Sequence, residues 1–300
     1  MGEDRTYRAL DHDYPYLLRE LRSPPDPLCV RGDLLAGPAV AIVGTRRPSD
    51  ESVVYTEGLA RRLVERGVAV WSGGAVGIDA AAHRGALQAG GRTVVVVPTG
   101  LDRCYPPEHA ELYEIVVASG GAIVSSFERR QLAQRHTFHQ RNAVLAALTQ
   151  ATVVIEAPIR SGARSTAKHA RRLRRPLFIV PTAPWEGRGK GNLIEIGLGG
   201  RPLVDEGLLF AALGVPQTGS ITMAKGAREA RPSSGDSPPK GLSDAGKIVF
   251  RAISSTPRHP DDLCAETGLP TALVQEALLT LVFEAVLVEG PAGWFRRVNF

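Results

Sequence analysis

Six short apolar runs, rich in β-branched residues, recur along the first two thirds of the chain, and successive runs start 25 to 29 residues apart. Between most of them lie segments with helical periodicity, such as 51–65, 78–89 and 140–148. Strands that are hydrophobic throughout and alternate with helices are typical of a parallel sheet covered on both faces. The pattern therefore predicts a doubly wound α/β domain, in which ligands bind beyond the carboxyl ends of the strands. The runs are residues 39–45, 68–74, 93–100, 122–127, 151–157 and 176–181.

The segments before and after this domain differ from it in composition and in hydrophobic pattern. Residues 14–35 are interrupted by prolines, and we expect them to wrap the domain as a lead-in. From about residue 213 to 241 the chain holds few large apolar residues, which is typical of a flexible linker. Three helical segments and a strand, Gly-Pro turn and strand follow, which is a winged-helix pattern. The expected parts are a lead-in at 1–38, the α/β domain at 39–212, the linker at 213–242 and the winged helix at 243–300.

Charge is unevenly divided between these parts. The chain carries a formal charge of +5 with a pI near 9.3, which is compatible with a polyanionic partner. Residues 243–300 contribute −2, so the first 242 residues carry +7. The third helical segment, 271–284, has no Lys or Arg, although that helix enters the major groove in a helix-turn-helix protein that reads DNA. We therefore interpret the winged helix as a contact for another protein.

Composition also bears on the compartment. No apolar run approaches the roughly 20 residues that cross a bilayer, and the first 15 residues are too polar for a secretory signal. The three cysteines, Cys29, Cys104 and Cys264, lie far apart and form no C-x-x-C pair. A disulfide framework is not expected, and a reducing cytoplasm without membrane association is the predicted setting.

The stretch WSGGAVGIDAAAHRGAL, residues 71–87, reads as a strand end, a glycine-rich turn and a helix start. Such turns bind phosphate because backbone N–H groups and the helix dipole face the anion. The sequence does not fit a dinucleotide site, because the turn follows the second strand and Ser72 stands where the first glycine belongs. A P-loop motif is absent as well. We expect no cofactor.

Two further turns of this kind follow strands in the predicted sheet. Glycines admit an anion close to the backbone, hydroxyls donate hydrogen bonds, and arginine or lysine supplies charge. Three such turns along one edge suit a chain of phosphates better than one nucleotide, although they could also be merely tight strand–helix connections. The candidate residues are Gly44, Thr45 and Arg46 in the first turn, Ser72, Gly73, Gly74 and Gly77 in the second, and Ser161, Gly162, Thr166 and Lys168 in the third.

A second candidate binding segment is RHTFHQRN, residues 135–142. There Arg135 and Arg141 flank Phe138 ahead of a helix. Cations interleaved with an aromatic residue suit single strands, since phosphates meet guanidinium groups while a base stacks on the ring. The alternative is that Phe138 belongs to the core and the arginines are solvated. His136 and His139 lack a carboxylate or cysteine partner, so no metal site is expected.

Two residues of the glycine-rich stretch have structural interpretations. Asp79 is expected to stabilise the start of its helix through the helix dipole, because a carboxylate beside a bound phosphate would repel it. His83, one turn further along, is expected to be packed or to support the site rather than to act as a catalyst.

At these residues the chain resembles the DprA/Smf family, the DNA-processing protein A of natural transformation. The resemblance implies an extended Rossmann-like sheet with a winged helix, binding of single-stranded DNA, a homodimer, protection of incoming DNA from nucleases and loading of the RecA recombinase, without catalytic activity. It also implies that Arg46 contacts the strand, that Gly73, Gly74 and Gly77 shape the pocket, and that Phe138, Arg141 and Asn142 correspond to the family's F-P-x-R-N-R. Ser161, Gly162, Thr166 and Lys168 would lie in its S-G-x-x-x-T-A segment. The strings that carry the resemblance are AIVGTRRPS, SGGAVGIDAAAHRGALQAGG, PTGLDRCYPPEHAEL, FHQRNAVLAAL, VVIEAPIRSGARSTAKHA and GNLIEIG.

The sequence departs from the family pattern at four positions. His139 replaces the proline of F-P-x-R-N-R, and Ala143 replaces its last arginine, which removes one phosphate or structural contact. Arg164 is an addition to the third turn and a candidate to compensate for Ala143. Thr182 stands where the family has the glycine of V-P-G. These changes bear on the path and affinity of the strand rather than on the fold.

Two other functions remain open on the sequence. A nucleotide phosphoribohydrolase of the lysine-decarboxylase-like group shares this style of sheet, but it needs P-G-G-x-G-T and a catalytic glutamate, whereas residues 72–79 read SGGAVGID. A regulatory adaptor that works through its winged helix is the third reading.

Overall fold

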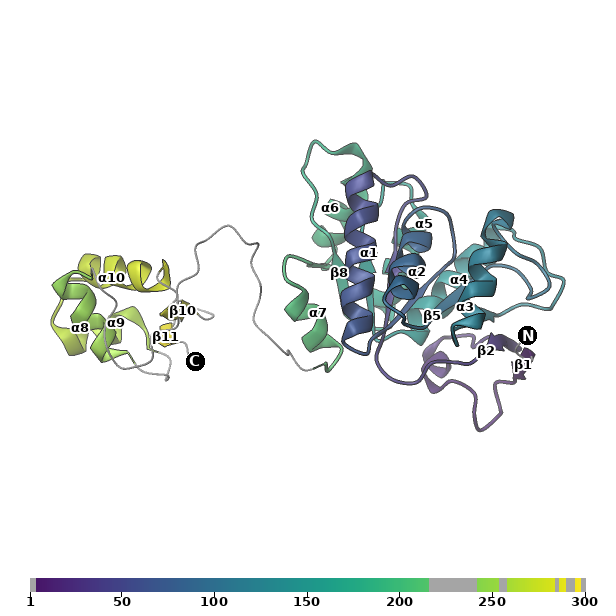
Figure 1. Ribbon diagram of the computed structural model, residues 1–300, viewed down its shortest axis with the longest axis horizontal. Helices are drawn as coiled ribbons and strands as arrows, with labels where there is room; N and C mark the ends of the chain where they lie inside the picture. The colour runs from purple at the N-terminus through teal and green to yellow at the C-terminus, as the bar shows by residue number, and fades with distance from the viewer. Residues whose placement is uncertain (1–3, 216–241, 254–257, 284–285, 290–294, 298–300) are drawn as a thin grey trace. The chain divides into compact units, whose positions relative to one another are not determined.

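The computed structural model describes residues 4–215, 242–253, 258–283, 286–289 and 295–297 (Figure 1). The chain divides into two compact units, Met1–Ser220 and Ile221–Phe300. Most of the predicted linker, residues 216–241, lies outside the described residues. Among the helices that the structure describes, none is both long and apolar enough to cross a membrane.

The first unit is built on one nine-stranded sheet. Seven neighbouring strands run parallel, and β1 and β2 join one edge in antiparallel fashion. Each of the six apolar runs forms a strand of the parallel part, which confirms the predicted doubly wound fold. Across the sheet the order is β1 (Asp4–Tyr7), β2 (Leu28–Gly32), β6 (Ala122–Ser125), β5 (Thr93–Val97), β4 (Ala69–Ser72), β3 (Ala39–Val43), β7 (Ala151–Val154), β8 (Leu177–Ile179) and β9 (Arg201–Pro202).

Helices cover both faces of this sheet. One face packs against α1 (Asp50–Glu65), α2 (Ile78–Gln88), α3 (Ala110–Ala118) and α7 (Glu206–Ala212). The other packs against the 3-10 helix η1 (Tyr16–Glu20), α4 (Arg135–Leu148), α5 (Gly162–Arg172) and α6 (Lys190–Gly197). Short 3-10 turns, η2 (Pro107–His109) and η3 (Gly187–Gly189), precede α3 and α6.

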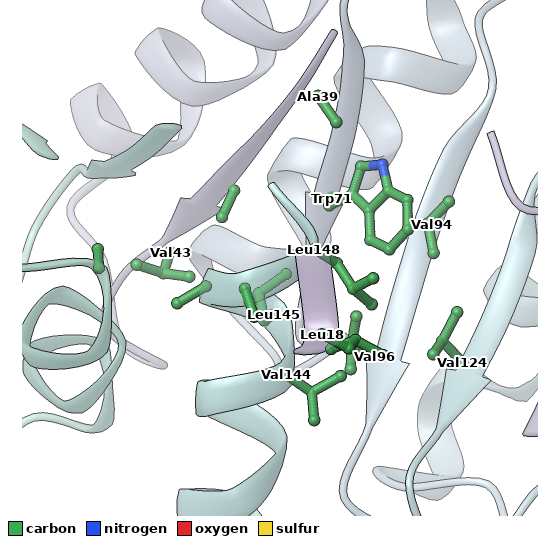
Figure 2. Packing of buried hydrophobic residues seen from close by; sticks show 14 of the residues in the cluster. Leu18, Ala39, Val43, Trp71, Val94, Val96, Val124, Val144, Leu145 and Leu148 are labelled. Carbon is green, nitrogen blue, oxygen red and sulfur yellow. The ribbon is translucent and has the colours of Figure 1, made fainter. Parts of the chain in front are cut away.

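The continuous hydrophobicity of the strands follows from this double cover. In β3, Ala41 and Val43 belong to the core under α4 and α5, while Val40 and Ile42 belong to the core under α1 and α2. Alternate side chains of a strand point to opposite faces, so both sets must be apolar when both faces are buried. Figure 2 shows the first of these cores, with Trp71 among valines of the sheet and leucines of α4.

The lead-in is a structural part of the sheet rather than a wrapping segment. Its residues form β1 and β2, and β2 pairs antiparallel with β6. Leu28 and Val30 are fully buried, and Tyr14 and Leu18 join the core beneath α4. The sequence did not indicate these strands because β1 reads DRTY, which contains no apolar run, and several prolines lie between β1 and β2.

Helix α4 begins earlier than the sequence indicates. The segment 135–142, which we expected to precede the helix, forms its first two turns. The hydroxyl of Thr137 accepts a hydrogen bond from the N–H of Gln134 at 3.0 Å and so stabilises the helix start. Residues Arg135, His136 and His139 are exposed and polar, so apolar periodicity cannot report this part of the helix.

The second unit has its own hydrophobic core and the predicted winged-helix order. Three helices, α8 (Asp244–Ala252), α9 (Pro260–Thr267) and α10 (Thr271–Phe283), precede an antiparallel pair of strands, β10 (Leu287–Glu289) and β11 (Phe295–Arg297). Val249, Leu263 and Leu281 are fully buried between the helices. The predicted Gly-Pro turn between the strands lies outside the described residues.

Candidate nucleic-acid interface

The carboxyl end of β3 lies between β4 and β7, where the order of the sheet reverses direction. In doubly wound folds this reversal leaves a crevice in which ligands bind. A cavity of about 470 Å³ opens there, and it is lined by the turns after β3, β4 and β7 and by the N-terminal half of α4. The predicted residues that line it are Gly44, Thr45, Arg46, Phe138, Arg141, Asn142, Ser161, Gly162 and Thr166.

The turn after β3 is fixed by backbone hydrogen bonds to both neighbours. The N–H of Thr45 donates to the carbonyl of Glu156 at 2.7 Å, and the N–H of Ile78 donates to the carbonyl of Thr45 at 3.2 Å. Gly77 makes the second contact possible, because its φ is +84° and a Cβ there would lie 2.5 Å from the Thr45 carbonyl oxygen. Gly77 therefore permits close packing of α2 against this turn and does not itself line the cavity.

The turn after β4 lies behind the cavity wall. Ser72 is fully buried and donates its hydroxyl proton to the carbonyl of Ile42 at 2.6 Å. Gly74 is buried as well, and its carbonyl accepts a hydrogen bond from the hydroxyl of Tyr113 at 3.2 Å. We expected Ser72, Gly73 and Gly74 to cradle an anion, but the geometry gives them a supporting position, since only Ala75 and Asp79 of this region reach the cavity.

Arg141 has a buried guanidinium, and Arg141 is only 5% exposed. It donates hydrogen bonds to the carbonyl of Val96 at 2.9 Å, to the carbonyl of Gly73 and to the side-chain oxygen of Asn142 at 3.0 Å. Burial lowers the pKa of the Arg141 guanidinium, and the charge of Asp79 acts in the opposite direction. The group still carries its charge, so it adds positive potential to the cavity floor. The sequence left Arg141 either as a phosphate contact or as a solvated cation. The structure shows that it is not solvated and that it braces the turn after β4, while it also lines the cavity.

Asp79 lies in the first turn of α2, as predicted, and its carboxylate accepts a hydrogen bond from the N–H of Ala75 at 3.3 Å. Burial raises the pKa of the Asp79 carboxyl, and Arg141 is the largest opposing influence. His83 is also packed as predicted, with its Nδ1 2.8 Å from the hydroxyl of Thr93. Asp79 therefore combines its helix-terminal position with a place in the cavity wall.

Phe138 forms the aromatic wall of the cavity. The guanidinium carbon of Arg46 lies 5.2 Å from the centre of the ring, and that of Arg141 lies 5.8 Å from it. Tyr105 meets the ring edge-on, with centroids 5.5 Å apart and planes at 75°. Phe138 is half-buried, so it is neither a core residue nor a free one. Its cation–π contact holds the otherwise exposed Arg46 at the cavity.

Four exposed arginines stand around the cavity: Arg46, Arg47, Arg135 and Arg160. None of the four forms an ion pair with a carboxylate that the structure describes. We call these four the rim arginines. Arg160 was missed in the sequence, although its place directly before Ser161 and Gly162 at the end of a strand is the signal that could have indicated it.

The third turn contributes polar groups to the same cavity as Arg46 and Arg47, which lie in the turn after β3. Ser161 caps α5, since its hydroxyl oxygen accepts the N–H of Ala163 at 3.2 Å. The carbonyl of Gly162 accepts a hydrogen bond from the side-chain amide of Asn142 at 3.3 Å, which joins the third turn to α4. The imidazole of His139, which also lines the cavity, lies 3.2 Å from the hydroxyl of Ser165.

Two predicted residues of α5 do not line the cavity. Arg164 forms an ion pair with the buried carboxylate of Glu195 at 2.7 Å and donates to the carbonyl of Ile159 at 2.6 Å. Its guanidinium is thus engaged away from the site, which corrects the expectation that it compensates for Ala143. Lys168 is exposed on α5 outside the cavity, so its contact with a strand stays a prediction.

Comparison with known proteins identifies the family to which the chain belongs. Residues 5–206 match the sequence model of the family described as DNA recombination-mediator protein A, and residues 233–285 match the DprA winged helix domain. The chain belongs to the DprA/Smf family. A curated relative, Protein Smf of Synechocystis, is 36% identical over 96% of this chain and 78% of its own length.

Two solved structures of DprA have the same fold. DNA processing protein A from Streptococcus pneumoniae is 32% identical, with a TM-score of 0.64 over 69% of this chain and 73% of its own. DNA processing protein A from Helicobacter pylori, whose structure is described in terms of its single-stranded DNA binding mode, is 30% identical, with a TM-score of 0.62 over 71% of this chain and 96% of its own. The extended Rossmann-like sheet and the winged helix are therefore those of a DprA/Smf protein.

Proposed function

We propose that this chain binds single-stranded DNA in the cavity at the carboxyl end of β3. The observation that carries the proposal is the set of rim arginines, which form no ion pair with a described carboxylate, in the cavity that the half-buried ring of Phe138 also lines. Guanidinium groups neutralise phosphates, and an aromatic ring at the base of a cavity offers a face to a nucleobase. A duplex keeps its bases stacked inside, so a recessed ring favours an unpaired strand.

We further propose that the protein acts without catalysis in natural transformation, where it protects incoming DNA and loads the RecA recombinase. The DprA/Smf family membership supports this role. The charge of the winged helix favours a protein partner: residues 243–300 carry a net negative charge, and the third helix holds no Lys or Arg. A nucleic-acid duplex would be repelled by such a surface.

A homodimer completes the proposal. Leu198, Val204 and Leu208 are exposed large apolar side chains around β9, the last strand at an edge of the sheet. An open sheet edge with apolar neighbours favours pairing with a second copy. The expected result is a dimer mass in light scattering after size exclusion and a shift toward monomer for Leu208→Glu. A monomer at all concentrations would contradict this part of the proposal.

Fluorescence anisotropy with single- and double-stranded oligonucleotides at several salt concentrations tests the binding. The unpaired strand should bind more tightly, with a slope of log K against log salt of about −3 when the four rim arginines each neutralise one phosphate. Arg46→Ala should weaken binding and leave unfolding unchanged. Arg61→Ala, which removes an exposed arginine from the far end of α1, is the matched control.

Binding that ignores salt, or that Arg61→Ala weakens as much as Arg46→Ala does, would count against the cavity as the site. Release of free base from nucleoside monophosphates would instead favour a phosphoribohydrolase.

A further inference from the structure

The loop between β8 and α6 carries the most exposed aromatic side chain that the structure describes. Trp185 is 85% exposed, whereas Trp71 is 3% exposed in the core. An indole left in water forgoes the stabilisation that burial of its large apolar surface would give. Arg188 and Lys190, a few residues further along, are exposed too. The loop therefore presents an aromatic plane beside two cations.

This loop adjoins the cavity along the same edge of the sheet. Strands β7 and β8 are parallel neighbours, so the loops that follow them leave the sheet side by side. The N–H of Gly191 donates to the carbonyl of Ala157 at 2.8 Å, and a Cβ on Gly191 would lie 2.5 Å from the carbonyl oxygen of Pro158. Pro158 lines the cavity, so the start of α6 packs directly behind the cavity wall.

The other side of the loop reaches the start of α1. Hydrogen bonds from the first turn of α1 and from Ser49 hold the pKa of the Glu51 carboxyl below its usual value, and the charge of Arg188 acts in the same direction. Arg188 thus lies near the helix that follows the rim arginines Arg46 and Arg47. Glu186, the acidic residue of the loop, accepts the N–H of Arg188 at 3.2 Å and so has a local role.

We propose that Trp185 is a second base-stacking platform, on which a DNA strand that leaves the cavity past Pro158 continues, with Arg188 and Lys190 meeting its phosphates. The inference rests on the proposed function of the cavity and extends its binding site by one loop. Every base has a π-face, so such a platform accepts any sequence, and adjacent cations neutralise the backbone. The residues that follow Trp185, 186–190, are charged or glycine, which suits a polyanion rather than an apolar partner.

Oligonucleotides of two lengths distinguish binding at the cavity from binding at Trp185. Trp185→Ala should weaken binding of an oligonucleotide of about 16 nucleotides by about 5- to 150-fold, the loss expected for one stacked base. Binding of a trinucleotide, which fills the cavity alone, should be unchanged. Trp185→Phe should restore most of the affinity because it keeps an aromatic face. Arg188→Ala and Lys190→Ala should each reduce the salt slope by about 0.7.

Tyr16→Ala is the matched control, because Tyr16 is 75% exposed on η1, whose Glu20 pairs at 2.9 Å with Arg175 beyond the C-terminal end of α5. No residue of η1 lines the cavity. Intrinsic fluorescence gives a second readout: in a Trp294→Phe background, the long oligonucleotide should quench the emission of Trp185, and Trp185→Phe should abolish that quenching.

Three outcomes would overturn the inference. Long oligonucleotides could bind Trp185→Ala as tightly as the unsubstituted chain while Arg46→Ala binds weakly, in which case the proposed function stands without this platform. Tyr16→Ala could weaken binding as much as Trp185→Ala. Trp185→Ala could alter self-association and leave DNA binding intact, which would assign the loop to a protein contact. Failure of every variant and of the unsubstituted chain to bind DNA would instead overturn the proposed function itself.

Discussion

Arg46 and Arg141 line the same cavity, but they differ in exposure and in the groups that they contact. Arg46 is exposed and held over the ring of Phe138, so its N–H groups can meet a ligand. Arg141 is buried and donates hydrogen bonds to the carbonyl of Gly73, in the turn after β4, and to the carbonyl of Val96, in β5. An arginine can thus contribute to an anion site either by contact or by holding the walls in place, and burial distinguishes the two roles.

Arg141→Met should destabilise the fold by about 3 kcal/mol, because it removes the buried guanidinium that donates to the carbonyls of Gly73 and Val96. Arg46→Met should change the free energy of unfolding by less than about 0.5 kcal/mol, since its side chain is at the surface. Urea unfolding of both variants measures the difference. Equal stabilities would mean that the guanidinium of Arg141 is replaceable by water.

His83 makes stability depend on pH. Burial lowers its pKa to about 3, with positive charge from His109, Arg141 and Arg84 acting in the same direction. In the unfolded chain the residue takes a proton near pH 6.5, so its contribution is present above that pH and is lost as the pH falls towards 3. The expected loss is about 2 kcal/mol between pH 7 and pH 5.

Denaturant unfolding at those two pH values, for the unsubstituted chain and for His83→Gln, isolates this contribution as a difference. The variant should lose less stability on acidification. If both proteins lose the same amount, His83 takes up its proton in the folded state and its burial has been misjudged.

At the scale of elements, α5 and α6 are joined through one buried carboxylate. Glu195 on α6 is 1% exposed and pairs with Arg164 and Arg171, which stand on α5 two turns apart. The pair of helices flanks the third turn of the cavity, so this triad keeps Ser161 and Gly162 in position. A residue that was expected to touch DNA, Arg164, therefore acts on the site through helix packing.

Glu195→Gln should cost about 2 kcal/mol of stability, because two guanidinium groups lose a buried partner. The cost stays below the range for fully buried pairs since those groups remain about a quarter exposed. Glu206→Gln breaks the more exposed pair with Arg62 and should cost less than about 1 kcal/mol. Thermal unfolding of both variants compares them, and a larger loss for Glu206→Gln would contradict the role given to the triad.

At the scale of the whole molecule, positive charge is concentrated outside the winged helix: residues 1–242 carry +7 and residues 243–300 carry −2. The cavity and the rim arginines belong to the first unit, which has its own cores on the two faces of the sheet. The second unit has a separate core, and its residues 243–300 carry a net charge of −2. This division argues that the first unit binds DNA and that the winged helix adds a contact with another protein.

A chain that ends at Val215 should therefore keep its affinity for single-stranded oligonucleotides within about twofold and keep its salt slope, because its phosphate contacts are unchanged. Anisotropy titration against the full chain measures this. The same truncation should abolish binding to RecA, measured by capture of RecA on the immobilised protein. Loss of DNA binding instead would favour an adaptor in which the winged helix carries the function.

The amino-acid sequence determined most of the architecture. The spacing of the apolar runs predicted six strands and a doubly wound fold, because a strand buried on both faces must be apolar throughout. Local turn chemistry indicated Gly44, Thr45 and Arg46, and the interleaving of cations with an aromatic residue indicated Phe138. The winged helix was readable for the same reason: its helices and strands are local patterns.

Only the tertiary structure decided which charged side chains face the cavity. The partners of Arg141 come from β4 and β5, and the partner of Arg164 comes from α6, so no local pattern announces that these guanidinium groups are engaged. The burial of Ser72 and Gly74 and the exposure of Arg160 are likewise set by distant segments. A sequence pattern depends only on neighbours along the chain. The burial of a charged group and its ion pairs depend on neighbours in space.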